Sequence, residues 1–303
     1  MTRLFQPPPA EQVYRSHLPG RYNGWAVEKY FADRFPFQEE SRWVEMIRTG
    51  KITVNGERIA PGHRVHLHDF IVTHMPARQE PAADRTLQVI FEDRHLRVFN
   101  KGAPLPVHPS GRYFQNSMTE LLKHAYPDEV PRPVQRLDAL TTGITVFAKS
   151  KPAATDLMTA LKQQRVEKEY LALVHGVPAS RAFEIDLPIG KRIGSARGVG
   201  PDVRNPRPAR TRFEWVGSRD GLSLLRAFPL TGRTNQIRVH LAECGLPIVN
   251  DPIYGRGRGE GEAGLGLHAF QLNFICRGKR YRLKAPVPRH FGHWNEFACH
   301  PLP

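Results

Sequence analysis

Cysteine is scarce in this 303-residue chain, and the few cysteines present form no recognisable set. Cys244, Cys276 and Cys299 are odd in number and far apart, so they predict neither a disulfide framework nor a four-ligand zinc site. The histidines clustered between His63 and His74 lack an acidic or cysteine ligand that would complete a metal site. We therefore expect no bound metal and a reducing compartment.

Long apolar segments are absent as well. No run approaches the roughly 20 apolar residues that a membrane span needs. The first residues, Met1–Gln12, are rich in proline and lack the apolar core of a secretory signal. We therefore expect a cytoplasmic protein with no membrane partner.

Acidic side chains are in the minority. The chain has 44 lysine and arginine residues against 29 acidic residues, which gives a formal charge of +15 and a pI near 10.1. Such an excess favours a polyanionic partner, and nucleic acid is the leading candidate. The alternative, a charge excess that only keeps the protein soluble, would be preferred if the chain held no RNA-reading segment.

The first part of the chain predicts a small domain of two helices and a hairpin. Apolar residues at helical spacing predict one helix within Trp25–Phe37, and a second is expected from Ser41, as its N-cap, to Gly50. Asn55–Gly56 supplies the positive backbone angles of a tight turn. The strands expected around this turn lie at Lys51–Val54, Arg58–Ala60 and Arg64–Val72.

The composition changes after this small domain. Residues 76–86 are rich in proline, alanine and charge and have no apolar periodicity, which is typical of a linker. We therefore expect a small domain at 1–75, with its core at about 25–72, and a larger domain at 87–303.

The larger domain has more expected strands than helices, which favours an α+β fold around a mixed, largely antiparallel sheet with flanking helices. The expected strands are Leu87–Phe91, Leu96–Asn100, Ile144–Ala148, Tyr170–His175, Thr211–Val216, Ser223–Pro229 and Tyr281–Lys284. The expected helices are Ser117–Tyr126, Lys151–Gln164 and Gln236–Cys244. Two glycine-rich segments, Lys191–Arg210 and Arg256–Gly266, predict mobile loops that could grip a substrate or simply cover the surface.

The most informative stretch is Arg136–Lys149, in which Arg136 and Asp138 precede a glycine and an apolar strand. Asp138 has two interpretations. It could cap a turn through the nearby threonines, which is the common role of an isolated aspartate at such a place. It could instead be a carboxylate held at the edge of a cleft.

Four motifs in order resemble the RNA pseudouridine synthases of the RluA type, the family named for uridine sites in the large ribosomal subunit and in transfer RNA. The motifs are Arg136–Lys149, Lys168–Gly176, Thr231–Leu241 followed by Gly245–Ile248 and Asp251–Gly255, and Leu283–Pro286. The resemblance covers about Leu87 to Pro288. The helix pair and the Asn55–Gly56 hairpin resemble the small α-L RNA-binding domain, first seen in a small-subunit ribosomal protein, that often precedes this catalytic domain.

The resemblance implies an enzyme that isomerises uridine to pseudouridine in structured ribosomal or transfer RNA, with Asp138 as its catalytic aspartate. It implies that Tyr170 stacks on the base and that Arg238 pairs with the aspartate. Without the motifs, Tyr170 would be interpreted as a core tyrosine on a strand, and Arg238 has the alternative of a salt bridge that only holds the fold.

The chain departs from the family pattern at three positions. The family usually has histidine where Gln135 and Asn235 stand, and the small domain often has glycine where His68 stands. Neither histidine is the catalytic residue of the family. Their absence here therefore concerns local hydrogen bonding and RNA preference.

The reaction breaks the bond from the base nitrogen to the sugar and rejoins the base through carbon without redox change, so we expect no redox cofactor. A carboxylate suits the first step, either by attacking the sugar or the ring or by taking a proton, and the residues do not choose between these. The target nucleotide should flip out of stacked RNA. Arg136 could then fill the vacated space or hold a phosphate, or be an ordinary surface cation.

Other cations are candidates for RNA contact. They are Arg233 and Lys284 in the larger domain and Arg42, Arg48 and Lys51 in the small one. Two other functions stay open: a non-catalytic RNA-binding or ribosome-assembly protein on the same fold, suggested by Gln135 and Asn235, and a metal-dependent RNA hydrolase. The hydrolase lacks a cluster of acidic ligands. We expect a monomer whose partner is RNA.

Overall fold

The computed structural model describes residues 4–192, 196–255 and 264–295, which fall into two compact units. Pro7–Glu80 form the small unit. The large unit contains the chain from Pro81 onward together with the first residues up to Gln6. Phe5 joins the large unit through an isolated β-bridge with Ala83.

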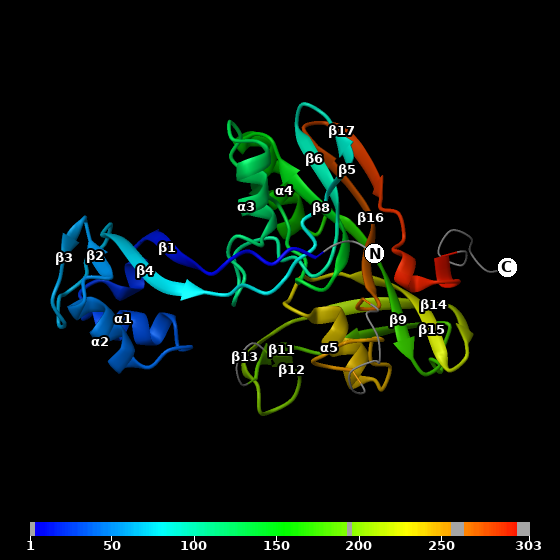
Figure 1. Cartoon of the computed structure of the whole chain (residues 1–303). Helices are drawn as coiled ribbons and strands as arrows, with labels where there is room; N and C mark the ends of the chain where they lie inside the picture. The colour runs from blue at the N-terminus through cyan, green and yellow to red at the C-terminus, as the bar shows by residue number, and fades with distance from the viewer. Residues whose placement is uncertain (1–3, 193–195, 256–263, 296–303) are drawn as a thin grey trace. The chain divides into compact units, whose positions relative to one another are not determined.

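The small unit packs two helices with a four-stranded antiparallel sheet of order β1-β4-β2-β3 (Figure 1). Its elements are β1 (Ala10–His17), the 3-10 turn η1 (Gly20–Tyr22), α1 (Val27–Arg34), α2 (Glu40–Arg48), β2 (Ile52–Val54), β3 (Glu57–Arg58) and β4 (Phe70–Arg78). Aromatic rings fill much of its core. Phe31 stacks on Trp43 with their ring centroids 4.7 Å apart, and Tyr22 and Tyr30 meet edge to face.

The predicted helix pair and hairpin are present with small shifts. Helix α2 has Glu39 at its N-cap and begins at Glu40, so Ser41 is not the cap. Asn55 and Gly56 have φ angles of 53° and 85° between paired strands, which confirms the predicted tight turn.

The sheet of the small unit extends beyond its expected limits. Strand β1 was not predicted, and β4 runs to Arg78, into the segment expected to be a linker. The two strands pair from His17 opposite Phe70 to Ala10 opposite Arg78. Main-chain hydrogen bonds hold such a strand pair together whatever its side chains are. The amino-acid composition of the two segments therefore did not indicate that they pair. His68 adopts φ 74°, a conformation that glycine accepts most readily.

The large unit is built on a ten-stranded mixed sheet, so the α+β class is confirmed. Its main path has the order β10-β14-β15-β9-β16-β8-β6-β5, with β17 beside β16 and β7 beside β8. All pairs are antiparallel except β16 with β8. The strands are β5 (Leu87–Glu92), β6 (Leu96–Lys101), β7 (Arg132–Pro133), β8 (Thr142–Ala148), β9 (Glu167–His175), β10 (Ala182–Asp186), β14 (Arg210–Arg219), β15 (Leu222–Pro229), β16 (Leu267–Cys276) and β17 (Lys279–Lys284).

The central strand β16 was not predicted. Seven of its ten residues are buried, the first four of them in succession, and burial alternates with partial or full exposure from Phe270 onward. Its first four residues are buried without alternation, which hides the start of the strand, although Phe270–Phe274 do alternate apolar and polar residues.

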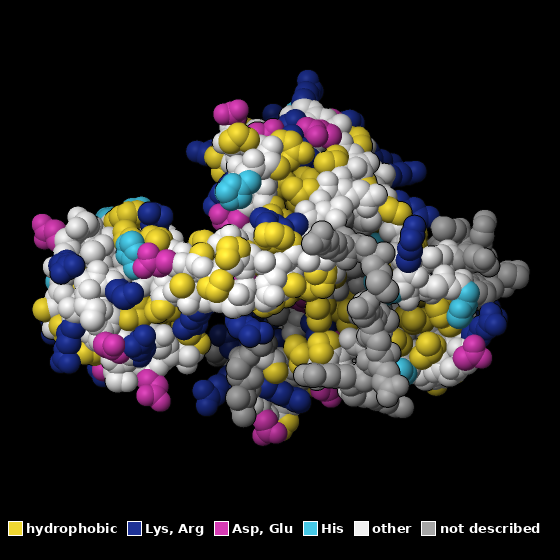
Figure 2. Space-filling model, in the orientation of Figure 1, with side chains coloured by type: hydrophobic (Ala, Val, Ile, Leu, Met, Phe, Trp, Pro, Cys, Tyr) yellow, Lys and Arg dark blue, Asp and Glu magenta, His cyan; other side chains and the backbone are white. Residues whose placement is uncertain are grey.

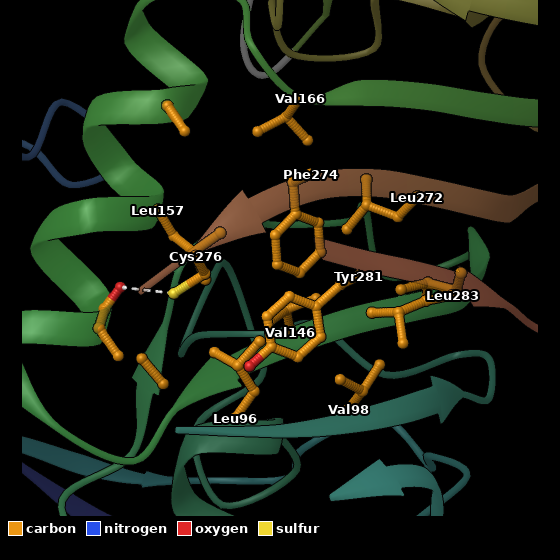
Figure 3. Packing of buried hydrophobic residues seen from close by; sticks show 14 of the residues in the cluster. Leu96, Val98, Val146, Leu157, Val166, Leu272, Phe274, Cys276, Tyr281 and Leu283 are labelled. Carbon is orange, nitrogen blue, oxygen red and sulfur yellow. Dashed lines mark hydrogen bonds between the residues drawn. The ribbon is translucent and has the colours of Figure 1, made fainter. Parts of the chain in front are cut away.

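Three helices and one 3-10 turn also belong to the large unit: α3 (Met118–Ala125), α4 (Lys151–Lys162), α5 (Gln236–Glu243) and η2 (Arg289–Phe291). Helix α4 starts at Ser150, whose side chain accepts the N–H of Ala153 at 3.4 Å, as an N-cap should. Its apolar face covers β8 and β16. In Figure 3, Leu157 of α4 lies over the core in which the rings of Phe274 and Tyr281 stack 5.0 Å apart.

A small sheet of order β12-β11-β13 has its strands in and beside the segment predicted as the first mobile loop, Lys191–Arg210, of which residues 193–195 lie outside the described part. Its strands are β11 (Ile189–Lys191), β12 (Arg197–Gly198) and β13 (Arg204–Arg207). Of the second predicted loop, Arg256–Gly266, residues 256–263 lie outside the described part. Among the described helices, none has the length and apolar character to cross a bilayer.

Gly143 follows Asp138 within the Arg136–Lys149 motif and lies where β8 meets β16. Glycine is required at this position. Its φ is 110°, and a Cβ there would lie 2.2 Å from the carbonyl oxygen of Ala269. Gly143→Ala should therefore lower the free energy of unfolding by roughly 3 kcal/mol, since backbone must move and the conformation is strained. Urea denaturation measures this.

The matched control is Gly221→Ala, where φ is 75° but nothing lies within 4 Å of the added methyl. That change should cost only about 1 kcal/mol, the strain of the left-handed conformation alone. Equal losses for the two variants would contradict close packing at Gly143.

Candidate active site

Asp138 lies in a loop that is tied down on both sides. Leu137 is buried in the core, and the carbonyl oxygen of Asp138 accepts the N–H of Thr141 at 3.1 Å. The carbonyl oxygen of Ala139 accepts the N–H of Leu105 at 2.8 Å. The loop therefore presents the Asp138 side chain, which is 25% exposed, from a fixed backbone.

Lys101, at the end of β6, adds a buried cation beneath this loop. It is 1% exposed, and its Nζ donates to the carbonyl oxygens of Gly102, Leu105 and Ala139 at 2.9, 2.7 and 3.2 Å. Burial lowers the pKa of Lys101 to about 7, against the opposing charge of Asp138. Three carbonyl acceptors suit the three N–H bonds of an ammonium. No local sequence pattern indicated this role for Lys101.

Arg238 is held by a buried carboxylate. It lies in α5, and its Nε and Nη2 donate to the two oxygens of Asp251 at 2.7 and 2.8 Å. The two side chains are only 4% and 0% exposed. Burial alone would raise the pKa of Asp251, but hydrogen bonds and the charge of Arg238 hold it below its usual value. Burial would likewise lower the pKa of Arg238, yet Asp251 keeps it raised.

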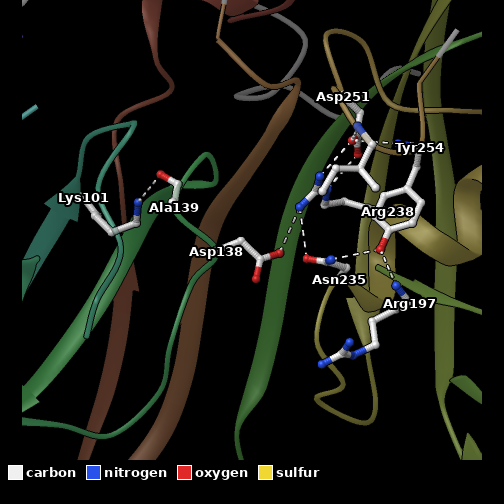
Figure 4. Close-up of polar contacts among 9 residues, drawn as sticks. Lys101, Asp138, Ala139, Arg197, Asn235, Arg238, Asp251 and Tyr254 are labelled. Carbon is white, nitrogen blue, oxygen red and sulfur yellow. Dashed lines mark hydrogen bonds and ion pairs between the residues drawn. The ribbon is translucent and has the colours of Figure 1, made fainter. Parts of the chain in front are cut away.

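The remaining end of the guanidinium points to Asp138. Arg238 Nη1 lies 3.4 Å from Asp138 Oδ2 and donates at 3.0 Å to Asn235 Oδ1 (Figure 4). The structure therefore brings together the aspartate and the arginine of two motifs that are 100 positions apart. The buried guanidinium therefore places a positive charge beside the Asp138 carboxylate.

Tyr170, on β9, lines the same cavity as this pair. The cavity has a volume of about 470 Å³. Burial, with a contribution from the charge of Asp138, raises the pKa of the Tyr170 hydroxyl, so the phenol keeps its proton at neutral pH. The cavity is lined by Asp138, Tyr170 and Arg238 together with residues of three connecting segments: 134–141, 161–168 and 229–237.

Lys168 is a cavity residue to which the sequence assigned no role. Its Nζ donates to the carbonyl oxygen of Thr231 at 3.1 Å, and burial lowers its pKa to about 8. Asp251 and Tyr254 also belong to the site, although the motif that contains them did not by itself predict a role for either. Asp251 could have been suspected, since a buried arginine needs a partner.

The candidate RNA-binding cations fall into three places. Arg136 and Arg233 line the cavity, and Arg233 Nε donates to the carbonyl oxygen of Pro208 at 2.9 Å. Lys284 does not line it. Its Nζ lies 4.6 Å from the ring centre of Phe270, which packs with Leu171 on the face of β9 opposite to Tyr170.

The other three candidates belong to the small unit. Arg42 is exposed in α2 and pairs with Glu45, Arg48 is exposed at the end of the same helix, and Lys51 follows it. Within the described ranges, no three histidine, cysteine or acidic side chains gather as a metal site would require.

Comparison with known proteins decides the family. The family model of RNA pseudouridylate synthase matches residues 95–243, which include Asp138, Tyr170 and Arg238. Over 300 residues the chain is 34% identical to "Ribosomal large subunit pseudouridine synthase D" of Pseudomonas aeruginosa, an alignment that covers 91% of this chain and 92% of the relative. The chain belongs to the RNA pseudouridine synthase family.

Some relatives in this family are longer than this chain. It is 32% identical to the yeast "tRNA pseudouridine(32) synthase, mitochondrial", over 81% of this chain, but spans only 54% of that protein and 46% of the human "Pseudouridylate synthase RPUSD2". The solved structure of "Human RNA Pseudouridylate Synthase Domain Containing 1" superposes with a TM-score of 0.59 at 28% identity, covering 69% of this chain and 86% of that one.

Removal of the buried carboxylate should destabilise the large unit. Asp251→Asn leaves the Arg238 charge without its bidentate partner, so the free energy of unfolding at neutral pH should fall by about 3 kcal/mol. Because the folded-state pKa of Asp251 is depressed, its contribution is present above its unfolded pKa of about 4 and is lost as pH falls through the folded value.

Urea denaturation of wild type and Asp251→Asn across pH measures both effects. The gap between the two proteins should stay constant from neutral pH to about pH 5 and narrow below about pH 4. A gap that widened in acid would contradict the assignment.

Proposed function

We propose that this chain isomerises uridine to pseudouridine in RNA, with Asp138 as its catalytic carboxylate. The observation that carries the proposal is the pairing of Asp138 with buried Arg238 at the wall of a cavity that Tyr170 also lines. Family membership supports the reaction class.

The geometry suits the bond changes of the reaction. The bond from C1′ of the ribose to N1 of uracil breaks, the base turns, and C1′ bonds to C5, whose proton finally moves to the released nitrogen. Asp138 is partly exposed and paired with a cation, so it is an available anion at the point where these bonds change. Tyr170 offers an aromatic face to the uracil and a protonated hydroxyl.

The target nucleotide must leave its stack to reach Asp138. A cavity of about 470 Å³ has room for one nucleotide but not for a duplex. Arg136 is exposed on the cavity wall, two residues before Asp138, where it can hold the flanking phosphate or occupy the vacated space.

We further propose that the small unit binds the RNA outside the target site. The α-L domain that it resembles binds RNA in this way. Arg42, Arg48 and Lys51 are the candidate contacts. Lysine and arginine side chains are spread over the visible face of this unit in Figure 2, with acidic ones between them. Such a distribution supports phosphate contacts along a folded RNA more than base reading.

The class of RNA is proposed from the relatives. Their names specify the large ribosomal subunit in bacteria and transfer RNA in yeast mitochondria. We propose a ribosomal or transfer RNA substrate and a cytoplasmic location, with which the free thiols of Cys244 and Cys276 agree. The protein would act as a monomer without metal or redox cofactor.

Asp138→Asn tests the function against the non-catalytic alternative. The neutral amide keeps the shape of the side chain but removes the anion, so conversion should slow by at least roughly 1,000-fold, about 4 kcal/mol of barrier, while RNA binding persists. Pseudouridine mapping in a deletion strain rescued by wild type or by Asp138→Asn measures the conversion.

If both proteins restore the same pseudouridines, Asp138 is not catalytic. If neither the deletion nor the rescue changes any pseudouridine while ribosome assembly depends on the chain, the non-catalytic function replaces the proposal.

Arg136→Ala and Lys284→Ala form a matched pair for the cavity's role in RNA binding. Both remove one exposed cation, but only Arg136 lines the cavity. Arg136→Ala should weaken binding and reduce the slope of log Kd against log salt by roughly 1, since one phosphate contact is lost. Titration of labelled RNA at several salt concentrations checks this, and equal effects of the two changes would argue against entry of RNA at this cavity.

A further inference from the structure

We propose that Asn235 is a positioning residue, whose side-chain amide turns Arg238 Nη1 toward Asp138, and that the hydroxyl of Tyr254 holds Asn235 in place. The inference rests on the proposed function, because it concerns how the Asp138 carboxylate is kept ready. Its evidence is a chain of hydrogen bonds behind the cavity wall.

Arg238 has one end that Asp251 does not fix. The bidentate contact with Asp251 uses Nε and Nη2, and leaves Nη1 with two N–H bonds. One of these goes to Asn235 Oδ1 at 3.0 Å, and the other faces Asp138 Oδ2 at the longer distance of 3.4 Å. Because the guanidinium is planar, Asp251 sets its plane, and the contact with Asn235 holds Nη1 in that plane facing Asp138.

Asn235 is used in the site and not as a helix cap. It stands at the N-cap of α5, where asparagine normally accepts a backbone N–H through its side chain, yet no such bond is made. The amide instead accepts from Arg238 and donates from Nδ2 to the Tyr254 hydroxyl at 3.0 Å. Its φ of 58° is a conformation that asparagine tolerates better than most residues.

Tyr254 is itself fixed from several directions. Its hydroxyl also accepts the backbone N–H of Arg197 at 2.9 Å, and its own N–H donates to Asp251 at 3.0 Å. Its ring centre lies 5.1 Å from the guanidinium carbon of Arg238. Figure 4 shows this path from Arg197 through Tyr254 and Asn235 to Arg238 and Asp138.

The neutrality of the amide matters for the chemistry. A carboxylate at 235 would compete with Asp138 for Nη1 and would place a second negative charge beside it. Among the described residues, the charged or titratable groups that act on Asp138 or line its cavity are Arg238, Lys101, Tyr170, Lys162, Lys168, Arg136 and Arg233. An asparagine keeps the direction of Arg238 and adds no charge that changes with pH.

The first test is Asn235→Gly, which retains the positive φ and removes both amide contacts. In steady-state assays of pseudouridine formation on target RNA, kcat should fall by about 100-fold with KM little changed, because orientation at the carboxylate is lost and RNA contacts are not. Asn205→Gly is the control, since Asn205 has φ 50° and is exposed on the small sheet, and it should behave as wild type.

The second test uses charge. Asn235→Asp keeps the size of the side chain, so a purely structural role would leave the pH profile unmoved. We expect the acid limb of kcat to shift to higher pH. Tyr254→Phe should also lower kcat, as Asn235→Gly does. The kcat of the double variant should be no lower than that of the less active single variant, because both changes act through one contact.

Unchanged kcat in Asn235→Gly, or an unshifted acid limb in Asn235→Asp, would overturn the inference. If the fold-losses in kcat of Tyr254→Phe and Asn235→Gly multiply fully in the double variant, the role assigned to Tyr254 is overturned. Wild type and Asp138→Asn are assayed beside them. An inactive wild type would refute the proposed function itself, whereas an active wild type with indifferent Asn235 variants refutes only the positioning role.

Discussion

The buried ion pair between Arg238 and Asp251 is the constraint on which the site depends. A guanidinium that is 4% exposed is stable only because a fully buried carboxylate grips two of its nitrogens. This grip leaves one end of Arg238 free to face the cavity. The direction in which Arg238 meets Asp138 is therefore set by Asp251, which comes late in the chain, together with Asn235.

The sheet gives this pair a rigid foundation. Asp138 precedes β8, Tyr170 lies on β9 and β16 runs between these strands, so the close contact at Gly143 fixes the distance between the two walls of the cavity. Lys101 holds the Asp138 loop from below through backbone carbonyls. Function at this site thus depends on packing that the RNA never touches.

Much of this could be predicted from the sequence. The α+β class, the three helices of the large unit and the Asn55–Gly56 turn followed from local patterns, and the motifs brought Asp138 and Arg238 into one hypothesis. Strand β1 could not be predicted, because its pairing partner is distant and its side chains do not alternate. Strand β16 was missed because its first four residues are buried in succession, although the residues that follow alternate. The roles of Lys101 and Asn235 depend on contacts between distant segments, which no local pattern contains.

The central claim is that an extruded uridine occupies the cavity beside Asp138. A crystal structure of the Asp138→Asn protein with its target RNA tests this most directly. The account predicts the uracil ring against Tyr170, with its ribose C1′ beside position 138 and Arg238 still on Asp251. A target uridine that stayed stacked in the RNA, or that bound elsewhere on the protein, would contradict it.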